Sequence, residues 1–564
     1  MRKPSSRPVF FTLMVVMAGL LVAGFQLAGP PRAPARSGGT ANVISALRPA
    51  AAITPVTGCA QLRNLDFSTL SAAPTQITSA AETTISGASY CEVKGEQAPE
   101  LQFDLRLPVS TWTGRYVQEG CGGYCGAVSP GAPQLAANCP AVTGNELALA
   151  TDNEGHVGAS GFDALWAAGD AGMRISYAYT SEHDLAIAAK AIIAAYYGRG
   201  PSRSYFDGCS DGGREALVEA QRYPRDFNGI LAGAPEIIAS ELNGEVQAWN
   251  ILSNMDSAGH EILTAEKLPV LHDAVIKQCG NAQGYIADPR ACDFSPASVE
   301  CPAGTDNGNC LTAAQVAVAE KLYSGPRDPQ GQSLYPGGEP YGSELAWSGW
   351  LIGPASDPAW PKDTIDYSAA LGMLRYIAFE KNPAASFQLT DWTFTLANYD
   401  RLTALNGLND ATDPDLSAFA KAGGKIIMYH GWADSAISPF GTVAYYSAVA
   451  RAVGGYAASQ AFSRLYMIPA QYHCLGGGTP QVTGDLLTPL MNWVEQGSAP
   501  GAQTFSVVNP AASLTSITVS PLDPDQPVTG HGLNDSYRWV GSFRSGTELW
   551  CTADGMTLAC RRAA

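Results

Sequence analysis

Residues 203–222 read RSYFDGCSDGGREALVEAQR, and this stretch decides the fold. A short strand is expected at 203–207 and an amphipathic helix at 214–222, with a glycine-rich turn between them. The turn, GCSDG, matches the pattern G-x-S-x-G, in which small neighbours permit a sharp strand-to-helix turn that exposes a serine oxygen. Ser210 is therefore the predicted nucleophile, and an ordinary glycine-rich turn is the alternative.

The alternation of strand and helix continues along the chain. Short apolar or alternating segments predict strands, and the alanine-rich segment 184–197, which is followed by Gly198, predicts a helix. The expected strands are 101–107, 115–118, 146–151, 229–232, 424–430 and 464–468. This order predicts an α/β fold with a mostly parallel sheet and helices on both of its faces.

A serine nucleophile needs a base and a carboxylate that orients the base, and chains with this turn carry them in the order Ser, Asp, His. Asp434 follows the expected strand 424–430, and His473 follows the expected strand 464–468. Both positions lie past the carboxyl end of a strand, where enzymes built on such sheets form their sites. The alternative for Asp434 is a turn-capping residue. The alternative base is His531, which has no strand before it.

Two cysteines adjoin the predicted catalytic residues. Cys209 directly precedes Ser210, and Cys474 directly follows His473. If the serine and histidine lie within hydrogen-bonding distance, the two cysteines come close together. A disulfide between them would then fix the nucleophile beside the base.

Three stretches resemble one known family. GCSDGGREALVEAQRYPRDFNGILAGAP (208–235), HGWAD (430–434) and QYHC (471–474) are similar to the tannase and feruloyl esterase family, which includes mono-terephthalate ester hydrolases. The likeness extends from about Cys59 to the C-terminus. It implies an α/β-hydrolase core with a large lid, secretion, and a triad of Ser210, Asp434 and His473.

The chain has 13 cysteines, and its first 28 residues are expected to be a signal peptide. Together these features indicate disulfides that form in an oxidising compartment. Local loop disulfides are favoured over metal binding because the sequence contains no CxxC motif. The resemblance implies the pairs Cys59–Cys91, Cys209–Cys474, Cys279–Cys292, Cys301–Cys310 and Cys551–Cys560. Cys121, Cys125 and Cys139 are then additions of this chain. Because 13 is odd, at least one thiol is free or pairs outside the chain.

The oxyanion of an ester-cleaving intermediate needs hydrogen-bond donors. The amide of Asp211, directly after the nucleophile, is one expected donor. The second is expected in the turn EGCGG (119–123) after strand 115–118, where the family match indicates Gly123. A plain hairpin turn is the alternative.

The chain departs from the family at two places. Family members usually carry a calcium loop resembling CDxxDGxxDGxIxDP, whereas residues 279–289 here read CGNAQGYIADP. Asp288 alone is a poor set of oxygen ligands, so we predict neither calcium nor another cofactor. Terephthalate-type members use a lid arginine, and residues 363–379 offer only Arg375, which weakens that assignment.

The sequence divides into five parts. We expect a signal peptide at 1–28, with an uncleaved membrane anchor as the alternative, and a disordered linker at 29–55. The hydrolase core is expected at 56–235 and 420–564, with an inserted lid domain at 236–419 between them. A secreted or periplasmic protein follows from these boundaries.

The net charge of −17 argues against nucleic acid as a partner. The sequence has no second long apolar run, which argues against a multi-span membrane protein. We therefore expect a serine carboxylic ester hydrolase whose partner is a small ester of an aromatic acid such as ferulate or gallate. Lid aromatics are expected to stack on the aryl group, the candidates being Trp347, Trp350, Tyr367 and Phe379. The alternatives are a hydrolase of aliphatic or mono-terephthalate esters and an inactive binding protein of the same fold.

Overall fold

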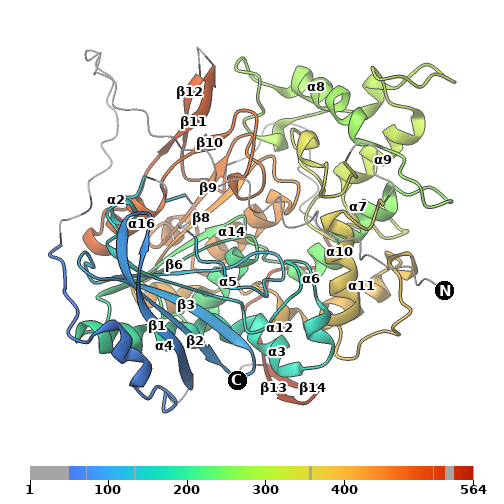
Figure 1. The fold of residues 1–564 in the computed structure, drawn as a ribbon. Coiled ribbons are helices and arrows are strands. Elements are labelled where there is room, and N and C mark those ends of the chain that lie inside the picture. Colours follow the sequence, from blue (N-terminus) through green and yellow to red (C-terminus); the bar gives the residue numbers. More distant parts are fainter. Residues whose placement is uncertain are drawn as a thin grey trace, which may run out of the picture. The chain divides into compact units, whose positions relative to one another are not determined.

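The computed structural model describes residues 47, 50–70, 73–131, 135–136, 138–354, 359–511, 514–526 and 539–562 (Figure 1). The predicted signal peptide, most of the predicted linker and His531 lie outside these residues. No helix among the described residues combines the length and apolar character needed to cross a bilayer.

The core is a nine-stranded sheet with the order β1-β2-β3-β5-β4-β6-β7-β8-β9. The pairs β1–β2, β2–β3 and β3–β5 are antiparallel, and the other five neighbouring pairs are parallel. The mostly parallel sheet predicted from the sequence is thus confirmed. The strands are β1 (Thr75–Ile85), β2 (Ala88–Gln97), β3 (Leu101–Pro108), β4 (Arg115–Glu119), β5 (Leu147–Asp152), β6 (Arg203–Cys209), β7 (Gly229–Gly233), β8 (Lys425–Gly431) and β9 (Ser463–Ile468).

Two smaller sheets lie in the last part of the chain. One sheet contains β10 (Val482–Thr483), β11 (Gln503–Ala511) and β12 (Leu514–Val519). The other contains β13 (Leu549–Asp554) and β14 (Thr557–Arg562). The helices are α2 (Pro140–Thr143), α3 (Ala171–Ile175), α4 (Ser181–Tyr197), α5 (Asp211–Arg222), α6 (Ala239–Glu241), α7 (Ala248–Ser253), α8 (Leu268–Cys279), α9 (Ala313–Ser324), α10 (Ile365–Gly372), α11 (Leu396–Leu402), α12 (Asn406–Asn409), α13 (Ser417–Lys421), α14 (Pro439–Ala452), α15 (Tyr456–Ser459) and α16 (Leu487–Gln496).

Helices cover both faces of the central sheet. Because successive side chains of a strand point to opposite faces, neighbouring residues pack into different apolar clusters. Phe206 and Ile230 are buried in an apolar cluster that includes residues of α4, α5 and α14. Their neighbours Tyr205 and Leu231 are buried in a second cluster with residues of α16 and β11. Strands that are buried on both faces have nearly continuous apolar sequences, which explains why these segments could be predicted as strands.

The segment between β7 and β8, residues 236–419, is called the insert below. Figure 1 shows α7, α8, α9, α10 and α11 of this insert gathered at one side of the central sheet. The insert has apolar clusters of its own, one around Trp347 and one around Met373. All described residues nevertheless belong to one compact unit, so a separate lid domain stays a prediction.

The last residues of the segment expected to be a disordered linker, 29–55, bond to the core. The amide of Ile53 donates to the carbonyl of Trp112 at 2.7 Å, and the amide of Val56 donates to the carbonyl of Tyr196 at 2.8 Å. The last residues of the expected linker are therefore part of the folded protein.

Candidate active site

The nucleophile candidate lies at the junction of β6 and α5. Ser210 has φ 69° and ψ −123°, a backbone conformation with positive φ that residues other than glycine rarely adopt. Such strain is typical of a serine at a sharp strand-to-helix turn. A Cβ atom on Gly208 would lie 2.3 Å from the carbonyl oxygen of Gly212, and one on Gly213 would lie 2.4 Å from that of Gly233. The glycines are therefore required by the close approach of the backbone.

Hydrogen bonds fix this turn to β7 and to the start of the insert. The amide of Ser210 donates to the carbonyl of Gly233 at 3.0 Å. The carbonyl of Ser210 accepts from the amides of Gly213, at 3.0 Å, and Glu236, at 3.1 Å. The conformation of Ser210 is thus held from three directions.

Ser210, His473 and Asp434 form a continuous hydrogen-bonded chain. Oγ of Ser210 lies 2.9 Å from Nε2 of His473, and Nδ1 of His473 lies 2.8 Å from Oδ2 of Asp434. The histidine follows β9 and the aspartate follows β8, at the carboxyl ends of neighbouring parallel strands. Asp434 is fully buried, whereas the His473 side chain is 14% exposed. The arrangement lets the histidine accept the serine proton while the carboxylate stabilises the imidazolium.

The carboxylate of Asp434 is held in its ionised form. Its Oδ1 accepts from the amides of Ala436, at 2.9 Å, and Ile437, at 3.0 Å. A second histidine, His430, brings its Nε2 to 3.2 Å from Oδ2. Burial opposes ionisation, but the charge of His473 and the hydrogen bonds from His430 and His473 outweigh it, so the pKa of Asp434 lies well below its usual value. The role of His430 escaped the sequence analysis, although it lies in the quoted segment HGWAD.

Cys209 and Cys474 form a disulfide with a Cα–Cα distance of 5.9 Å, which links the residue before Ser210 to the residue after His473. The other pairs implied by the resemblance are also present in the structure, namely Cys59–Cys91, Cys279–Cys292, Cys301–Cys310 and Cys551–Cys560. The three additional cysteines separate into a Cys121–Cys125 disulfide and the buried free thiol of Cys139.

The loop after β4 lies against the start of α5. The amide of Gly212 donates to the carbonyl of Cys121 at 2.8 Å, and the amide of Gly120 donates to that of Asp207 at 3.0 Å. Gly123 has φ 68°, and a Cβ there would lie 2.2 Å from the carbonyl oxygen of Gly161. Asp211 is the first residue of α5, so its amide has no acceptor within the helix. Asp211 thus directly follows Ser210, and the loop that carries Gly123 is bonded to the start of the same helix; the oxyanion role of the two amides stays a prediction.

The candidate aromatic residues of the insert separate into two groups. Trp347 is fully buried, and Phe379 is 8% exposed; both lie inside apolar clusters of the insert. Trp350 is half-buried and contacts the catalytic histidine candidate edge to face, with 5.4 Å between the centroids of its ring and that of His473. Tyr367 is also half-buried, at the edge of the cluster around Met373. Trp350 is therefore the expected aromatic with a direct contact to the site.

The guanidinium of Arg375 is engaged within the insert. Its Nε and Nη2 both donate to the carbonyl of Phe387. These bonds orient the guanidinium toward the backbone of the insert, and the structure adds no support for a terephthalate-binding role of Arg375.

The residues that replace the family calcium loop do not fit a calcium ion. Both carboxylate oxygens of Asp288 accept from the guanidinium of Arg290, at 2.9 Å to Nε and 2.7 Å to Nη2. A cation beside Asp288 would compete with this arginine. Within the described residues, the side chains spaced closely enough to hold a metal are Cys121, Cys125, Glu154, Asp211 and Glu215. The two sulfurs of that group are joined in a disulfide, which removes the thiolate ligands.

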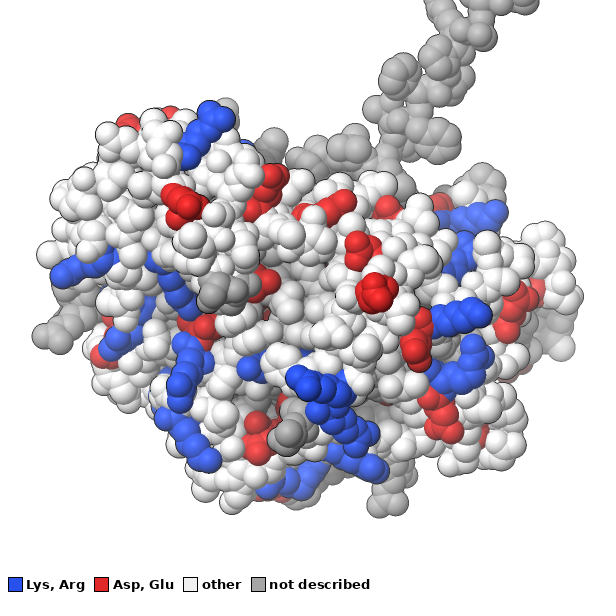
Figure 2. Space-filling view, turned by 90° about the horizontal axis from the view of Figure 1, so that it is seen from below, with Lys and Arg blue, Asp and Glu red and all other residues white. Residues whose placement is uncertain are grey.

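Charged side chains on the surface are mixed in sign. On the face that Figure 2 shows, lysines and arginines occur singly or in small groups, with acidic residues between them and broad uncharged areas. The expectation that nucleic acid is not a partner stays a prediction.

Comparison with known proteins identifies relatives over most of the chain. The family model for tannase and feruloyl esterase matches residues 83–518. A mono(2-hydroxyethyl) terephthalate hydrolase from Piscinibacter sakaiensis is 31% identical over 482 residues, which cover 73% of this chain and 77% of that protein. A probable feruloyl esterase B-2 from Aspergillus fumigatus is 29% identical over 452 residues, which cover 75% and 80%. The crystal structure of feruloyl esterase B from Aspergillus oryzae has the same fold, with a TM-score of 0.69, 23% identity, and coverage of 82% of this chain and 96% of that one.

Proposed function

Because this chain belongs to the tannase and feruloyl esterase family and is a carboxylic ester hydrolase, we propose that it is secreted and cleaves esters of aromatic acids with a Ser210–His473–Asp434 triad. The observation that carries the proposal is the hydrogen-bonded chain from Ser210 Oγ through His473 to Asp434. The same three residues would serve aliphatic or mono-terephthalate esters, which are outcomes of the test below.

The mechanism follows from the positions of the protons. His473 takes the proton of Ser210 as Oγ attacks the ester carbonyl, and Asp434 stabilises the resulting imidazolium. The histidine then gives that proton to the leaving alcohol, which leaves an acyl group on Ser210. Water, deprotonated by His473, hydrolyses the acyl-enzyme and restores the serine. These steps require neither a metal nor an organic cofactor.

The oxyanion of each tetrahedral intermediate is assigned to the amides of Asp211 and Gly123. Asp211 adjoins the nucleophile, and the bond from Gly212 to Cys121 places the loop of Gly123 against the same helix end. Fixed backbone donors are effective here because they need no reorganisation during the reaction, and one such donor is worth about 3–4 kcal/mol of the barrier.

An aromatic acyl group is supported by Trp350 and by the names of the relatives. The indole of Trp350 is half-buried beside His473, so a flat acyl group bound next to the histidine would meet it. Aromatic rings interact favourably edge to face as well as in offset stacks. Secretion is supported by the six disulfides, which persist in oxidising compartments.

The test uses four esters with purified protein: methyl ferulate, methyl gallate, mono(2-hydroxyethyl) terephthalate and 4-nitrophenyl butyrate. We expect the highest kcat/KM with an ester of an aromatic acid, and a loss of at least about 10⁴-fold in kcat for Ser210→Ala. Ser447→Ala is the matched control, because the hydroxyl of Ser447 donates to the carbonyl of Val443 within its own helix, α14.

The outcomes separate the alternatives. Turnover confined to the butyrate would contradict the aromatic-acid assignment but keep the triad. Activity that survives in Ser210→Ala would overturn the triad. A protein that hydrolyses no ester, and whose Ser210 is not labelled by a fluorophosphonate, would be the inactive binding protein.

A further inference from the structure

The disulfide between Cys121 and Cys125 encloses the turn that carries Gly123. The two cysteines are four residues apart, with a Cα–Cα distance of 5.6 Å. Within the ring, the amide of Cys125 donates to the carbonyl of Gly122 at 3.2 Å. Gly122 is exposed, and a Cβ atom there would meet no other atom within 4 Å. A side chain at Gly122 would thus point into open space, and glycine is the residue that least restrains the backbone.

The base of the ring is bound to the nucleophile helix α5. The carbonyl of Cys121 accepts from the amide of Gly212 at 2.8 Å, and the amide of Cys121 donates to Oε2 of Glu215 at 3.2 Å. Gly120 contacts the same carboxyl group so closely that a Cβ would lie 2.0 Å from Oε2 of Glu215. The ring therefore begins at a fixed point on α5.

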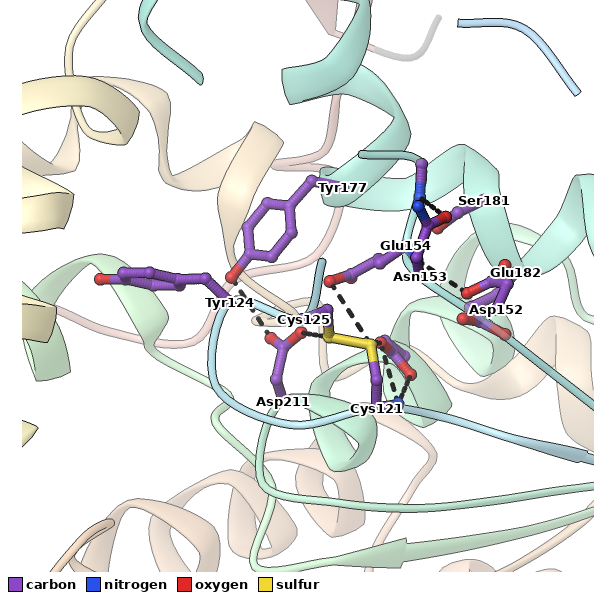
Figure 3. Close-up of a disulfide and its surroundings, with 12 residues drawn as sticks. Cys121, Tyr124, Cys125, Asp152, Asn153, Glu154, Tyr177, Ser181, Glu182 and Asp211 are labelled. Carbon is purple, nitrogen blue, oxygen red and sulfur yellow. Dashed lines mark hydrogen bonds between the residues drawn. A yellow bond between two sulfur atoms is a disulfide. The ribbon is translucent and has the colours of Figure 1, made fainter. Parts of the chain in front are cut away.

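The sulfur atoms contact the carboxyl groups of that helix. Sγ of Cys121 lies 3.1 Å from Oε1 of Glu215, and Sγ of Cys125 lies 3.6 Å from Oδ2 of Asp211. Figure 3 shows the disulfide with the side chains of Asp211 and Glu154 directed toward it. Since Asp211 also supplies the other proposed oxyanion amide, the disulfide touches the residue of one donor and encloses the other donor.

A buried ionic network fixes Asp211 and Glu154 in turn. The guanidinium of Arg214 is fully buried and bonds to Asp211 through Nε and to Glu154 through Nη2, both at 2.5 Å. It also donates to the carbonyls of Ala178 and Tyr177, at 3.1 Å each. The surface against which the sulfurs rest is thus rigid, because its charged groups have directed partners.

The far side of the ring is bound to other segments. The amide of Tyr124 donates to the carbonyl of Gly161 at 2.6 Å, and its hydroxyl donates to the carbonyl of Ala369 in α10 at 2.7 Å. Nε2 of His156 lies 2.7 Å from the carbonyl oxygen of Tyr124. Between these two anchored sides, the disulfide acts on Gly122 and Gly123 together with the bond from the Cys125 amide to the Gly122 carbonyl and the close contact of Gly123 with the carbonyl of Gly161.

We propose that the Cys121–Cys125 disulfide is a positioning element of the active site, which holds the Gly122–Gly123 turn so that the amide of Gly123 faces the oxyanion. This inference rests on the proposed triad mechanism. It assigns a function to two cysteines that the resemblance to the family does not account for. The disulfide acts through backbone donors and touches no reacting atom.

The test compares two double variants in which a short-range disulfide is removed. Cys121→Ser with Cys125→Ser opens the ring, whereas Cys301→Ser with Cys310→Ser opens a disulfide of the insert with a separation of nine residues. With 4-nitrophenyl acetate as substrate, we expect kcat to fall about 10- to 100-fold in the first variant, since a displaced donor costs less than the roughly 100- to 1,000-fold loss of a deleted one. KM should change less than twofold. In the control, kcat should stay within twofold of wild type.

A second measurement distinguishes positioning from general destabilisation. Phenylboronic acid forms a tetrahedral, anionic adduct with a catalytic serine, so its affinity depends on the oxyanion donors. We expect its Kd to rise by about the same factor as kcat falls, while both double variants keep a wild-type circular dichroism spectrum. Unchanged kcat and unchanged boronate affinity in the first variant would overturn the proposal, as would equal losses in both variants.

If the first variant does not fold, wild-type protein is reduced stepwise with TCEP, and activity is read before the free thiols are alkylated and mapped by peptide mass spectrometry. The proposal requires kcat to fall in step with the reduction of Cys121 and Cys125 and to return on reoxidation. Full activity with this pair reduced would refute it. Failure of the proposed function is separate, because wild-type protein would then lack fluorophosphonate labelling at Ser210.

Discussion

Removal of the Cys209–Cys474 disulfide should destabilise the protein far more than removal of a short-range disulfide. The cross-link joins residues 265 positions apart, whereas Cys551–Cys560 spans nine. In the chain-entropy model, cross-links of these lengths raise the free energy of the unfolded chain by about 5.6 and about 2.6 kcal/mol at 25 °C. We therefore expect Cys209→Ala with Cys474→Ala to lower the free energy of unfolding by about 3 kcal/mol more than Cys551→Ala with Cys560→Ala does.

The assay is urea unfolding followed by tryptophan fluorescence, with the free energy extrapolated to water for wild type and both double variants. Equal slopes against urea concentration are required, since a changed slope would report a different unfolded state. A difference below about 1 kcal/mol between the two variants would refute the chain-entropy reasoning. It would mean that the folded sheet or a compact unfolded state already supplies the restraint.

Activity without urea gives an independent readout on the same variant. The parallel pairing of β6, β7, β8 and β9 still places Ser210 near His473 when the cross-link is absent. A displacement of about 1 Å in reacting groups costs about 100-fold in rate. We expect a smaller loss than this, because the hydrogen bonds from the amide of Ser210 to the carbonyl of Gly233 and between His473 and Asp434 remain.

Three further predictions test the electrostatics of the protein. Asp434→Asn should lower kcat about 10⁴-fold with little change in KM, because the amide favours the wrong tautomer of His473; steady-state kinetics measure this. Burial raises the pKa of Glu245 to about 8, whereas a glutamate in the unfolded chain titrates near pH 4.3. The folded state therefore holds the extra proton between these values, so Glu245 should contribute a fall in stability with rising pH of about 1.4 kcal/mol per unit between about pH 5 and 8. In urea titrations at several pH values, the slope for Glu245→Gln should be less steep by this amount, while other buried carboxyls such as Glu236 keep their own contributions. EDTA or added calcium should shift the melting temperature by less than about 1 °C in differential scanning fluorimetry, since Arg290 occupies the carboxylate of Asp288; a larger shift would contradict the calcium-free assignment.

The sequence predicted those elements whose signal is local. The strands β6, β7, β8 and β9 are short apolar runs because helices cover both of their faces, and the turn at Ser210 is visible because glycine is required on both sides of it. The first two strands, β1 and β2, were not predicted. β1 carries few large apolar residues and is largely exposed at the sheet edge, so its composition resembles that of a loop.

Contacts between distant residues could not be predicted in the same way. The sequence predicts an amphipathic helix at 214–222, but the charged side chains Arg214, Glu215 and Glu219 of α5 are buried. One of the carboxylates that pair with the buried guanidinium of Arg214 belongs to Glu154, which lies 60 residues earlier in the chain. Likewise, three cysteines lie at 121, 125 and 139, and spacing alone does not show which two pair.

The location of the insert bears on how such enzymes diversify. It leaves the central sheet after β7 and returns at β8, and these two strands are direct parallel neighbours, with Gly229 opposite Lys425. An exchange of the whole segment between relatives would therefore leave the register of every strand of the central sheet unchanged. Recombination could alter the accepted substrate without rebuilding the catalytic machinery. A successful graft would have to reproduce the contact of Trp350 with His473 and the hydrogen bonds of Glu236 with Ser210 and of Ala369 with Tyr124.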